Sequence, residues 1–183
     1  MKFLMVLALI LPFCSLWANP VVITGFGPFG SHAHNISSLA LEHIEQHRDD
    51  IITAVIPVNW ELAAQYAGSL KPGEIGAVII LGLDERLTDE ITLELQAHNR
   101  TSHLPDISGR YPPNHGMVIP GAPDTIASPA AQGLAAHFPV SLDPGGYLCG
   151  WFYFQLLYRL EGTPVVLLHI PPEEDIETVF HAI

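Results

Sequence analysis

The sequence predicts an α/β protein, a three-layer α/β/α sandwich with a mostly parallel central sheet. Short apolar, β-branched runs alternate along the chain with stretches of helical periodicity. One run, Ala77–Leu81, is continuously apolar, which is typical of a strand buried on both faces. The 183 residues are 49% apolar and 14% charged, so the chain can bury a core and is not a disordered polymer.

The first half of the chain predicts three strands and two helices. Val21–Thr24 is β-branched and ends at the glycine- and proline-bearing loop Gly25–Gly30. Ser37 or Ser38 can cap a helix that runs to about His47. The elements that follow are the strand Ile51–Val58, the helix Trp60–Leu70 and the strand Ala77–Leu81.

The second half begins with a weaker pattern. We interpret Gly82–Met117 as long loops around a short strand near Ile91–Gln96. Helices and strands then alternate again, at Ser128–His137, Pro139–Leu142, Leu148–Leu160, Pro164–Ile170 and Glu173–Ala182. In parallel sheets of this kind, ligands bind beyond the carboxyl ends of the strands. The loops after the strands are therefore where a site is expected.

The first eighteen residues have the pattern of a secretory signal peptide. Met1–Ala18 carries Lys2, then the apolar run Phe3–Phe13, then a small residue at its end. The run is too short to span a bilayer, although an uncleaved anchor helix is the alternative. We therefore expect a single domain at residues 19–183, exported to the periplasm or secreted.

Charge and histidine spacing narrow the classes of partner. Lys and Arg number 7 against 19 Asp and Glu, a net charge of −12, which argues against nucleic acid and anionic membranes as partners. His43 and His47 lie four residues apart, and His32 and His34 lie in a loop, but no acidic or cysteine ligand supports them. We expect no metal.

The aromatic run Trp151–Tyr158 indicates a buried helix, with the interface of a homo-oligomer as the alternative.

A thiol and an imidazole are expected at one edge of the sheet. Without Met1–Ala18, Cys149 is the lone cysteine, and it begins a helix, where the helix dipole lowers a thiol pKa. A helix of about 13 residues rises ~20 Å, and the following strand of about 7 residues spans roughly 23 Å. The chain thus leaves an edge at Cys149 and returns to it at His169. Together they form the minimum for nucleophilic catalysis.

Two questions stay open from the residues alone: whether Cys149 and His169 are catalytic, and which carboxylate would orient His169. Cys149 and His169 could be a buried structural cysteine and a histidine at a strand end. A carboxylate that orients His169 would complete a triad, and Glu94 is the candidate because burying it without a partner would be costly. Spacing does not separate Glu94 from its neighbours Asp84, Glu85, Asp89 and Glu90.

Four segments share their order and spacing with a known family. They are Thr24–Gly30 followed by Asn35, Gly82-Leu83 with Ile91–Glu94 and Ala97–Asn99, Gly145–Cys149, and Leu168–Pro171. Together they resemble the pyroglutamyl peptidase I family, also called pyrrolidone-carboxylate peptidases, over nearly the whole chain after Ala18.

The resemblance implies a thiol protease, an omega peptidase that hydrolyses N-terminal pyroglutamate from blocked peptides without a cofactor. By the same resemblance Cys149 is the nucleophile, His169 the general base and acid, and Glu94 the residue that orients His169. The backbone N–H of Cys149, at a helix start, would serve the developing oxyanion.

The implied substrate pocket is apolar. Phe26 and Phe29 would wall the five-membered lactam, with Tyr147 and Leu148 close by. A blocked terminus carries no ammonium group, so such a pocket needs apolar walls rather than an acidic clamp.

Some positions depart from the family. Its members are typically cytoplasmic and have no signal peptide. Asp84-Glu85-Arg86 replaces a glycine-bearing stretch, Leu95 and His103 stand where arginines are usual, and Gly150 replaces an asparagine. The alternatives are therefore a catalytically impaired homologue that binds pyroglutamyl peptides, or a cysteine hydrolase of another small amide.

Overall fold

The computed structural model describes residues 19–114 and 116–183, and its central feature is a six-stranded sheet. The strand order is β2-β1-β3-β8-β4-β7. The strands are β1 (Val21–Phe26), β2 (Ile51–Ile56), β3 (Ala77–Leu83), β4 (Thr92–Glu94), β7 (Val140–Ser141) and β8 (Val165–Ile170). Only the β4–β8 pair is antiparallel in this sheet, which confirms the mostly parallel arrangement.

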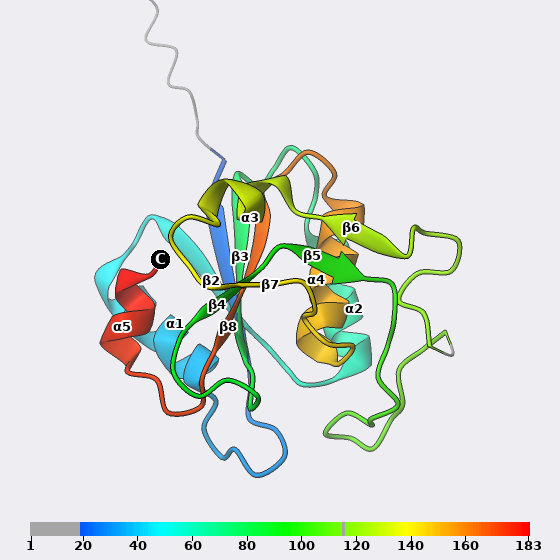
Figure 1. Cartoon of the computed structure of the whole chain (residues 1–183), viewed down its shortest axis with the longest axis horizontal. Coiled ribbons are helices and arrows are strands. Elements are labelled where there is room, and N and C mark those ends of the chain that lie inside the picture. The colour runs from blue at the N-terminus through cyan, green and yellow to red at the C-terminus, as the bar shows by residue number, and fades with distance from the viewer. Residues whose placement is uncertain (1–18, 115) are drawn as a thin grey trace, which may run out of the picture.

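Helices cover both faces of the sheet and complete three layers (Figure 1). The helices are α1 (Ile36–His47), α2 (Trp60–Ser69), α3 (Pro129–Leu134), α4 (Leu148–Arg159) and α5 (Ile176–His181). α1 and α5 pack together on one face, and α2 and α4 pack together on the other. The predicted fold class is confirmed.

The apolar core lies on both sides of the sheet. On the α2–α4 side, four consecutive residues of α4, Trp151–Phe154, are each at most 1% exposed. This confirms the predicted buried helix for most of the aromatic run, whose last residue, Tyr158, is exposed. On the other side, Leu41 and Ile44 of α1 pack with Val179 of α5.

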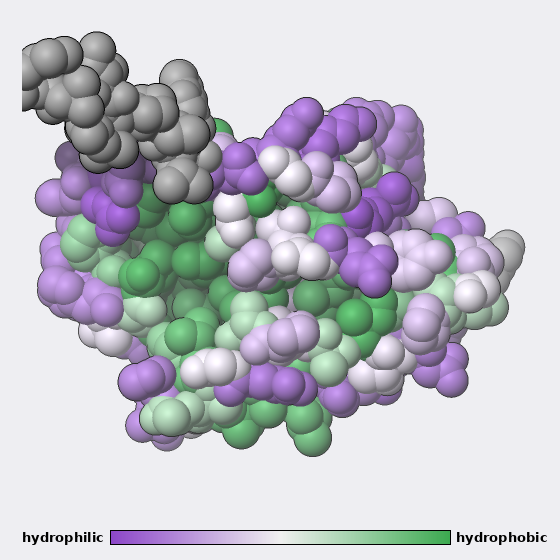
Figure 2. All heavy atoms as spheres, turned by 90° about the horizontal axis from the view of Figure 1, so that it is seen from above, coloured by the Kyte–Doolittle hydropathy of each residue, from purple (hydrophilic) through white to green (hydrophobic). Residues whose placement is uncertain are grey.

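Some large apolar side chains stay at the surface. Ile52 and Val55, on the edge strand β2, are half exposed. Figure 2, a view from the end where β1 begins, shows apolar residues surrounded by polar ones. Within the described residues, no helix combines the length and the apolarity that crossing a membrane requires.

The structure differs from the predicted elements around Leu95. The strand expected at Ile91–Gln96 divides into β4 and β5 (Gln96–His98), and β5 pairs with β6 (Thr125–Ala127) in a separate two-stranded sheet. The chain passes from one sheet to the other at Leu95, whose N–H donates to Ser141 O and whose carbonyl accepts from Ser128 N. The residues of β6 are exposed or partly exposed, so no apolar run indicated this strand.

Gly25 in β1 tests how tightly α1 packs on the sheet. A Cβ at Gly25 would lie 2.7 Å from the backbone oxygen of Ser37, so Gly25→Ala should destabilise the protein by about 1–3 kcal/mol through overpacking. Gly68→Ala in α2 is the matched control, because nothing lies within 4 Å of its added Cβ, and alanine favours helix by about 1 kcal/mol. Urea denaturation measures both. Equal stability of the two variants would contradict this packing.

Candidate active site

The carboxyl ends of the central strands gather the chemically active side chains. Phe26 ends β1, His169 is the penultimate residue of β8, and Gly82 is the penultimate residue of β3. Gly82 pairs with His169 across the β3–β8 register. Cys149 lies in the first turn of α4, which packs against the same sheet. The edge predicted from the helix and strand lengths therefore brings Cys149 and His169 together.

Cys149 and His169 both lie against the backbone of Gly82. A Cβ built on Gly82 would lie 2.9 Å from the Cys149 Sγ and 3.0 Å from the His169 Cδ2. The missing side chain at Gly82 is thus the space that the sulfur and the ring occupy. Cδ2 is the ring carbon bonded to Nε2, so the edge of the ring that carries Nε2 shares this space with the sulfur.

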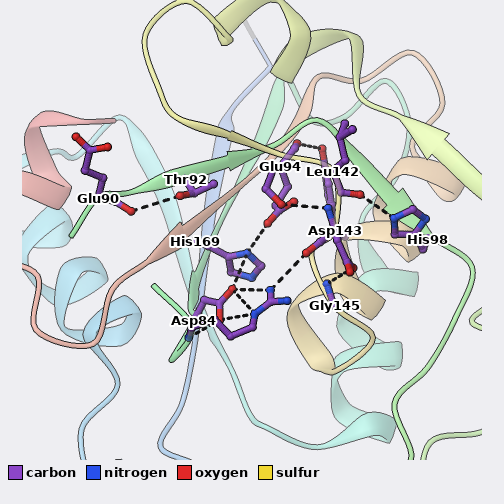
Figure 3. Close-up of polar contacts among 12 residues, drawn as sticks. Asp84, Glu90, Thr92, Glu94, His98, Leu142, Asp143, Gly145 and His169 are labelled. Atoms are coloured by element: carbon purple, nitrogen blue, oxygen red, sulfur yellow. Dashed lines mark hydrogen bonds and ion pairs between the residues drawn. The ribbon is translucent and has the colours of Figure 1, made fainter. Parts of the chain in front are cut away.

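Glu94 holds the opposite side of the imidazole. Its Oε1 lies 2.8 Å from the His169 Nδ1, and the two side chains are 1% and 3% exposed (Figure 3). A carboxylate oxygen can only accept, so Nδ1 carries the hydrogen and Nε2 is left as the basic nitrogen. The Glu94 Oε2 is also buried and has no hydrogen-bond partner among the described residues.

Asp84 is a second carboxylate near the same nitrogen. Its Oδ2 lies 3.8 Å from the His169 Nδ1, and Figure 3 shows the ring between Asp84 and Glu94. Of the acidic residues that spacing did not separate, Glu94 makes the hydrogen bond, and Asp84 lies farther away, within ion-pair distance of a protonated ring.

The thiol differs from the sequence-based expectation. Burial, followed by the negative charge of Asp84 and then that of Glu94, raises the pKa of the Cys149 thiol to about 12. Hydrogen bonding to the Cys149 backbone N–H lowers the pKa, but by less. The helix start was expected to lower it overall, and that expectation is wrong in direction. Desolvation of a thiolate outweighs a helix dipole here, although Cys149 is only half-buried and lines a cavity.

Glycines let the loop before Cys149 wrap the start of α4. The loop 143–146 is fixed at Asp143, whose carboxylate accepts from Arg100 and from the Gly145 N–H. Gly145 has φ +73°, a left-handed conformation that glycine adopts without strain. A Cβ at Gly150 would overlap the Gly145 carbonyl oxygen. Glycine at position 150, the departure from the family pattern, is thus required by this close approach.

A cavity of about 600 Å³ opens over the thiol. Its walls include all four predicted substrate-binding residues, together with Cys149 and His169. Phe26 and Leu148 are buried, and Tyr147 packs between Phe29 and Trp60 at ring-centroid distances of 6.3 and 5.4 Å. The rest of the lining comprises Gly30, Asn35, Val58, Leu83–Arg86, Ser102, Leu104–Ile107 and Pro144–Gly146, of which nothing in the sequence indicated Val58, Ser102 and Leu104–Ile107.

Buried polar residues fix the loops of this cavity. The Asn35 side chain donates to the Gly27 carbonyl and accepts from the Ser37 N–H, which holds the loop that carries Phe29. Asp106 accepts from the backbone of Trp60 and of Arg110, which holds the long loop 102–110 against α2. Asn35 belonged to a recognised motif, whereas Asp106 had no signal beyond its place in a polar stretch.

The remaining sequence candidates lie elsewhere. His103 is exposed, and Leu95 packs against the core cluster on the α1 side of the sheet, so neither position brings a cation to the cavity. His43 and His47 stack on each other in α1, 4.2 Å between ring centroids. Within residues 19–114 and 116–183, no group of three or more His, Cys, Asp or Glu side chains could hold a metal ion.

The chain is similar to known pyrrolidone carboxyl peptidases over most of its length. The solved structure of the enzyme from Thermus thermophilus is 31% identical, with a TM-score of 0.74, and the match covers 88% of this chain and 95% of that one. Pyroglutamyl-peptidase 1 of Rattus norvegicus is 28% identical over 166 residues, 83% of this chain and 78% of the relative. The pyroglutamyl peptidase I from Bacillus amyloliquefaciens shares the fold, with a TM-score of 0.76 at 20% identity. No protein-family model matches the chain.

These relatives correct the prediction of export. The chain matches a typically cytoplasmic family, and Met1–Ala18, on which the prediction of a signal peptide depended, lies outside the described residues. The expectation of a secreted or periplasmic protein is therefore wrong. A short apolar run after a lysine is a feature of composition, and composition alone does not establish where a protein is located. That residues 19–183 form a single domain stays a prediction.

The family follows from sequence and structure together. The match to the Thermus thermophilus enzyme exceeds 30% identity and spans nearly all of both chains. The fold agrees over the same span, with a TM-score of 0.74, and the relatives are cysteine-type hydrolases that act on peptides with a blocked N-terminus. On these grounds, the chain belongs to the pyroglutamyl peptidase I, or pyrrolidone carboxyl peptidase, family.

Proposed function

We propose that this protein removes N-terminal pyroglutamate from peptides, with Cys149 as nucleophile, His169 as general base and acid, and Glu94 as the residue that orients His169. The observation that carries the proposal is the shared contact of the Cys149 sulfur and the His169 ring at Gly82, with Glu94 hydrogen-bonded behind the ring. The family supplies the substrate class.

The order of proton transfers follows from the protonated thiol. With its pKa raised to about 12, Cys149 is a neutral thiol at neutral pH. His169 Nε2 therefore takes the thiol proton as the sulfur attacks the carbonyl carbon of the pyroglutamyl residue. The imidazolium that forms is stabilised by Glu94 at Nδ1.

The remaining steps return the enzyme to its starting state. The tetrahedral intermediate collapses, the C–N bond breaks, and His169 gives its proton to the leaving amine. The thioester left on Cys149 is then attacked by water, from which His169 takes a proton, and pyroglutamate leaves as the thiol is restored.

The cavity suits a small neutral ring beside the sulfur. We assign Phe26, Phe29, Tyr147 and Leu148 to the lactam, since their side chains give apolar walls without an acidic clamp. The first turn of α4 has no side-chain cap, so backbone N–H groups there, including that of Cys149, are available to the oxyanion. A homo-oligomer stays a prediction.

A pyroglutamyl aminomethylcoumarin substrate tests the proposal. The protein should release the fluorophore, and Cys149→Ala should lower kcat by roughly 10³-fold or more, because the nucleophile is lost. Glu94→Gln should retain binding but lose most of kcat. Binding of the substrate without turnover in the wild type would favour an impaired homologue. Cleavage of other small amides but not of this one would favour a different hydrolase.

Gly82→Ala tests the shared contact. The added Cβ would displace the Cys149 sulfur and the His169 ring, and a shift of about 1 Å costs roughly 10²-fold in rate. Gly133→Ala in α3 is the control, because its Cβ would meet nothing within 4 Å. Circular dichroism checks that both variants fold. Full activity in a folded Gly82→Ala variant would contradict the geometry.

The raised thiol pKa predicts how alkylation depends on pH. Because only the thiolate reacts, the rate of Cys149 modification by iodoacetamide should rise steadily with pH above neutrality, towards the raised pKa of about 12. Mass spectrometry of the modified peptide measures the rate. Rapid modification that is constant between pH 5 and pH 8 would instead reveal a preformed thiolate–imidazolium pair.

A further inference from the structure

We propose that Asp84 is a positioning residue of the active site, a second carboxylate that acts on His169 Nδ1 together with Glu94 and whose charge is balanced by Arg86. The inference rests on the proposed function for its effect on turnover, but the arrangement has a consequence that is independent of any substrate. Figure 3 shows the imidazole between the two carboxylates.

The backbone holds Asp84 beside the histidine. Asp84 directly follows β3, and its N–H donates to the carbonyl of Ile170, the residue after His169, at 3.0 Å. The side chain is only 10% exposed, and its Oδ2 lies 3.8 Å from Nδ1. The pairing of β3 with β8 thus places Asp84 beside His169, and the Asp84 carboxylate points inward rather than into solvent.

Arg86 keeps this carboxylate charged. Its Nε and Nη2 donate to Asp84 at 2.6–3.0 Å, and its backbone N–H donates to Oδ1. Burial raises the pKa of the Asp84 carboxyl, but the hydrogen bonds from Arg86 and the charges of His169 and Arg86 together hold it below its ordinary value. Arg86 also reaches the Asp143 carbonyl at 3.4 Å, which ties the pair to the loop before Cys149.

The charges around the ring set the direction of the effect. Three titratable groups face His169: Glu94 from β4, Asp84 after β3 and Cys149 from α4. Arg86 flanks the ring through its hydrogen bonds to Asp84. A second anion stabilises the imidazolium that forms during attack. The same anion opposes the thiolate, and it is one cause of the raised pKa of Cys149. Asp84 therefore stabilises the imidazolium that forms during attack and disfavours a free thiolate before it.

Two substitutions move these equilibria in opposite directions. Asp84→Asn removes an anion 3.8 Å from Nδ1, so the acid limb of the kcat/KM profile should move down by about one pH unit and kcat should fall about tenfold. The alkaline rise of Cys149 alkylation should also move down. Arg86→Gln leaves the negative charge of Asp84 without its cation. The acid limb of the kcat/KM profile and the alkaline rise of Cys149 alkylation should therefore both move to higher pH. Arg86 is 59% exposed, so its loss is compatible with folding.

Matched controls separate this effect from a structural one. Asp89→Asn makes the same change at an exposed carboxylate in the same loop. Arg48→Gln breaks a surface pair with Asp50, two residues away, as Asp84 is from Arg86. Neither should move either limb. Thermal denaturation of all four variants accompanies the profiles.

The alkylation profile decides the proposal without a substrate. Opposite shifts in Asp84→Asn and Arg86→Gln, with no shift in the controls, support the role of Asp84. The proposal would be overturned if the alkylation profiles of the folded Asp84→Asn and Arg86→Gln variants coincide with that of the wild type. It would also be overturned if both profiles shift in the same direction. If the alkylation limbs shift as expected but no pyroglutamyl amide is cleaved, the proposed function fails while the positioning role stands.

Discussion

The buried hydrogen bond between Glu94 and His169 Nδ1 is the constraint on which the site depends. Both side chains are almost fully enclosed, so each would be costly to bury without the other. Because a carboxylate only accepts, the bond fixes the tautomer of the ring and turns its basic nitrogen away from Glu94. Gly82 then leaves the space in which that edge of the ring meets the Cys149 sulfur.

The same enclosure decides how the thiol is activated. A sulfur at a helix start gains from the dipole, but here burial and two nearby carboxylates act against the thiolate. The base must therefore be strong and correctly oriented at the moment of attack. Glu94 and Asp84 are the two anions near Nδ1 of the imidazole, and the neutral thiol lies at the Nε2 edge. The same two carboxylates stabilise the imidazolium and destabilise the free thiolate.

Periodicity and element length predicted much of this architecture. The meeting of Cys149 and His169 followed from a helix and a strand of nearly equal length, and the place of Phe26 and Phe29 in the pocket was implied by the family resemblance. Spacing alone did not separate Glu94 from Asp84, because the choice depends on the β4–β8 register and on the return of the chain after β3; the family resemblance pointed to Glu94. The direction of the thiol pKa also depends on burial, which local sequence does not report. The leader-like composition of Met1–Ala18 led to a wrong expectation of export.

The tautomer of His169 is the most direct test of this account. Nitrogen-15 NMR of the labelled protein at neutral pH distinguishes the two ring nitrogens by their shifts and couplings. The account predicts a hydrogen on Nδ1, protected from exchange by its bond to Glu94, with Nε2 as the nitrogen that gains and loses a proton. A neutral ring with its hydrogen on Nε2, or an Nδ1 hydrogen that exchanges as freely as in an exposed histidine, would contradict it.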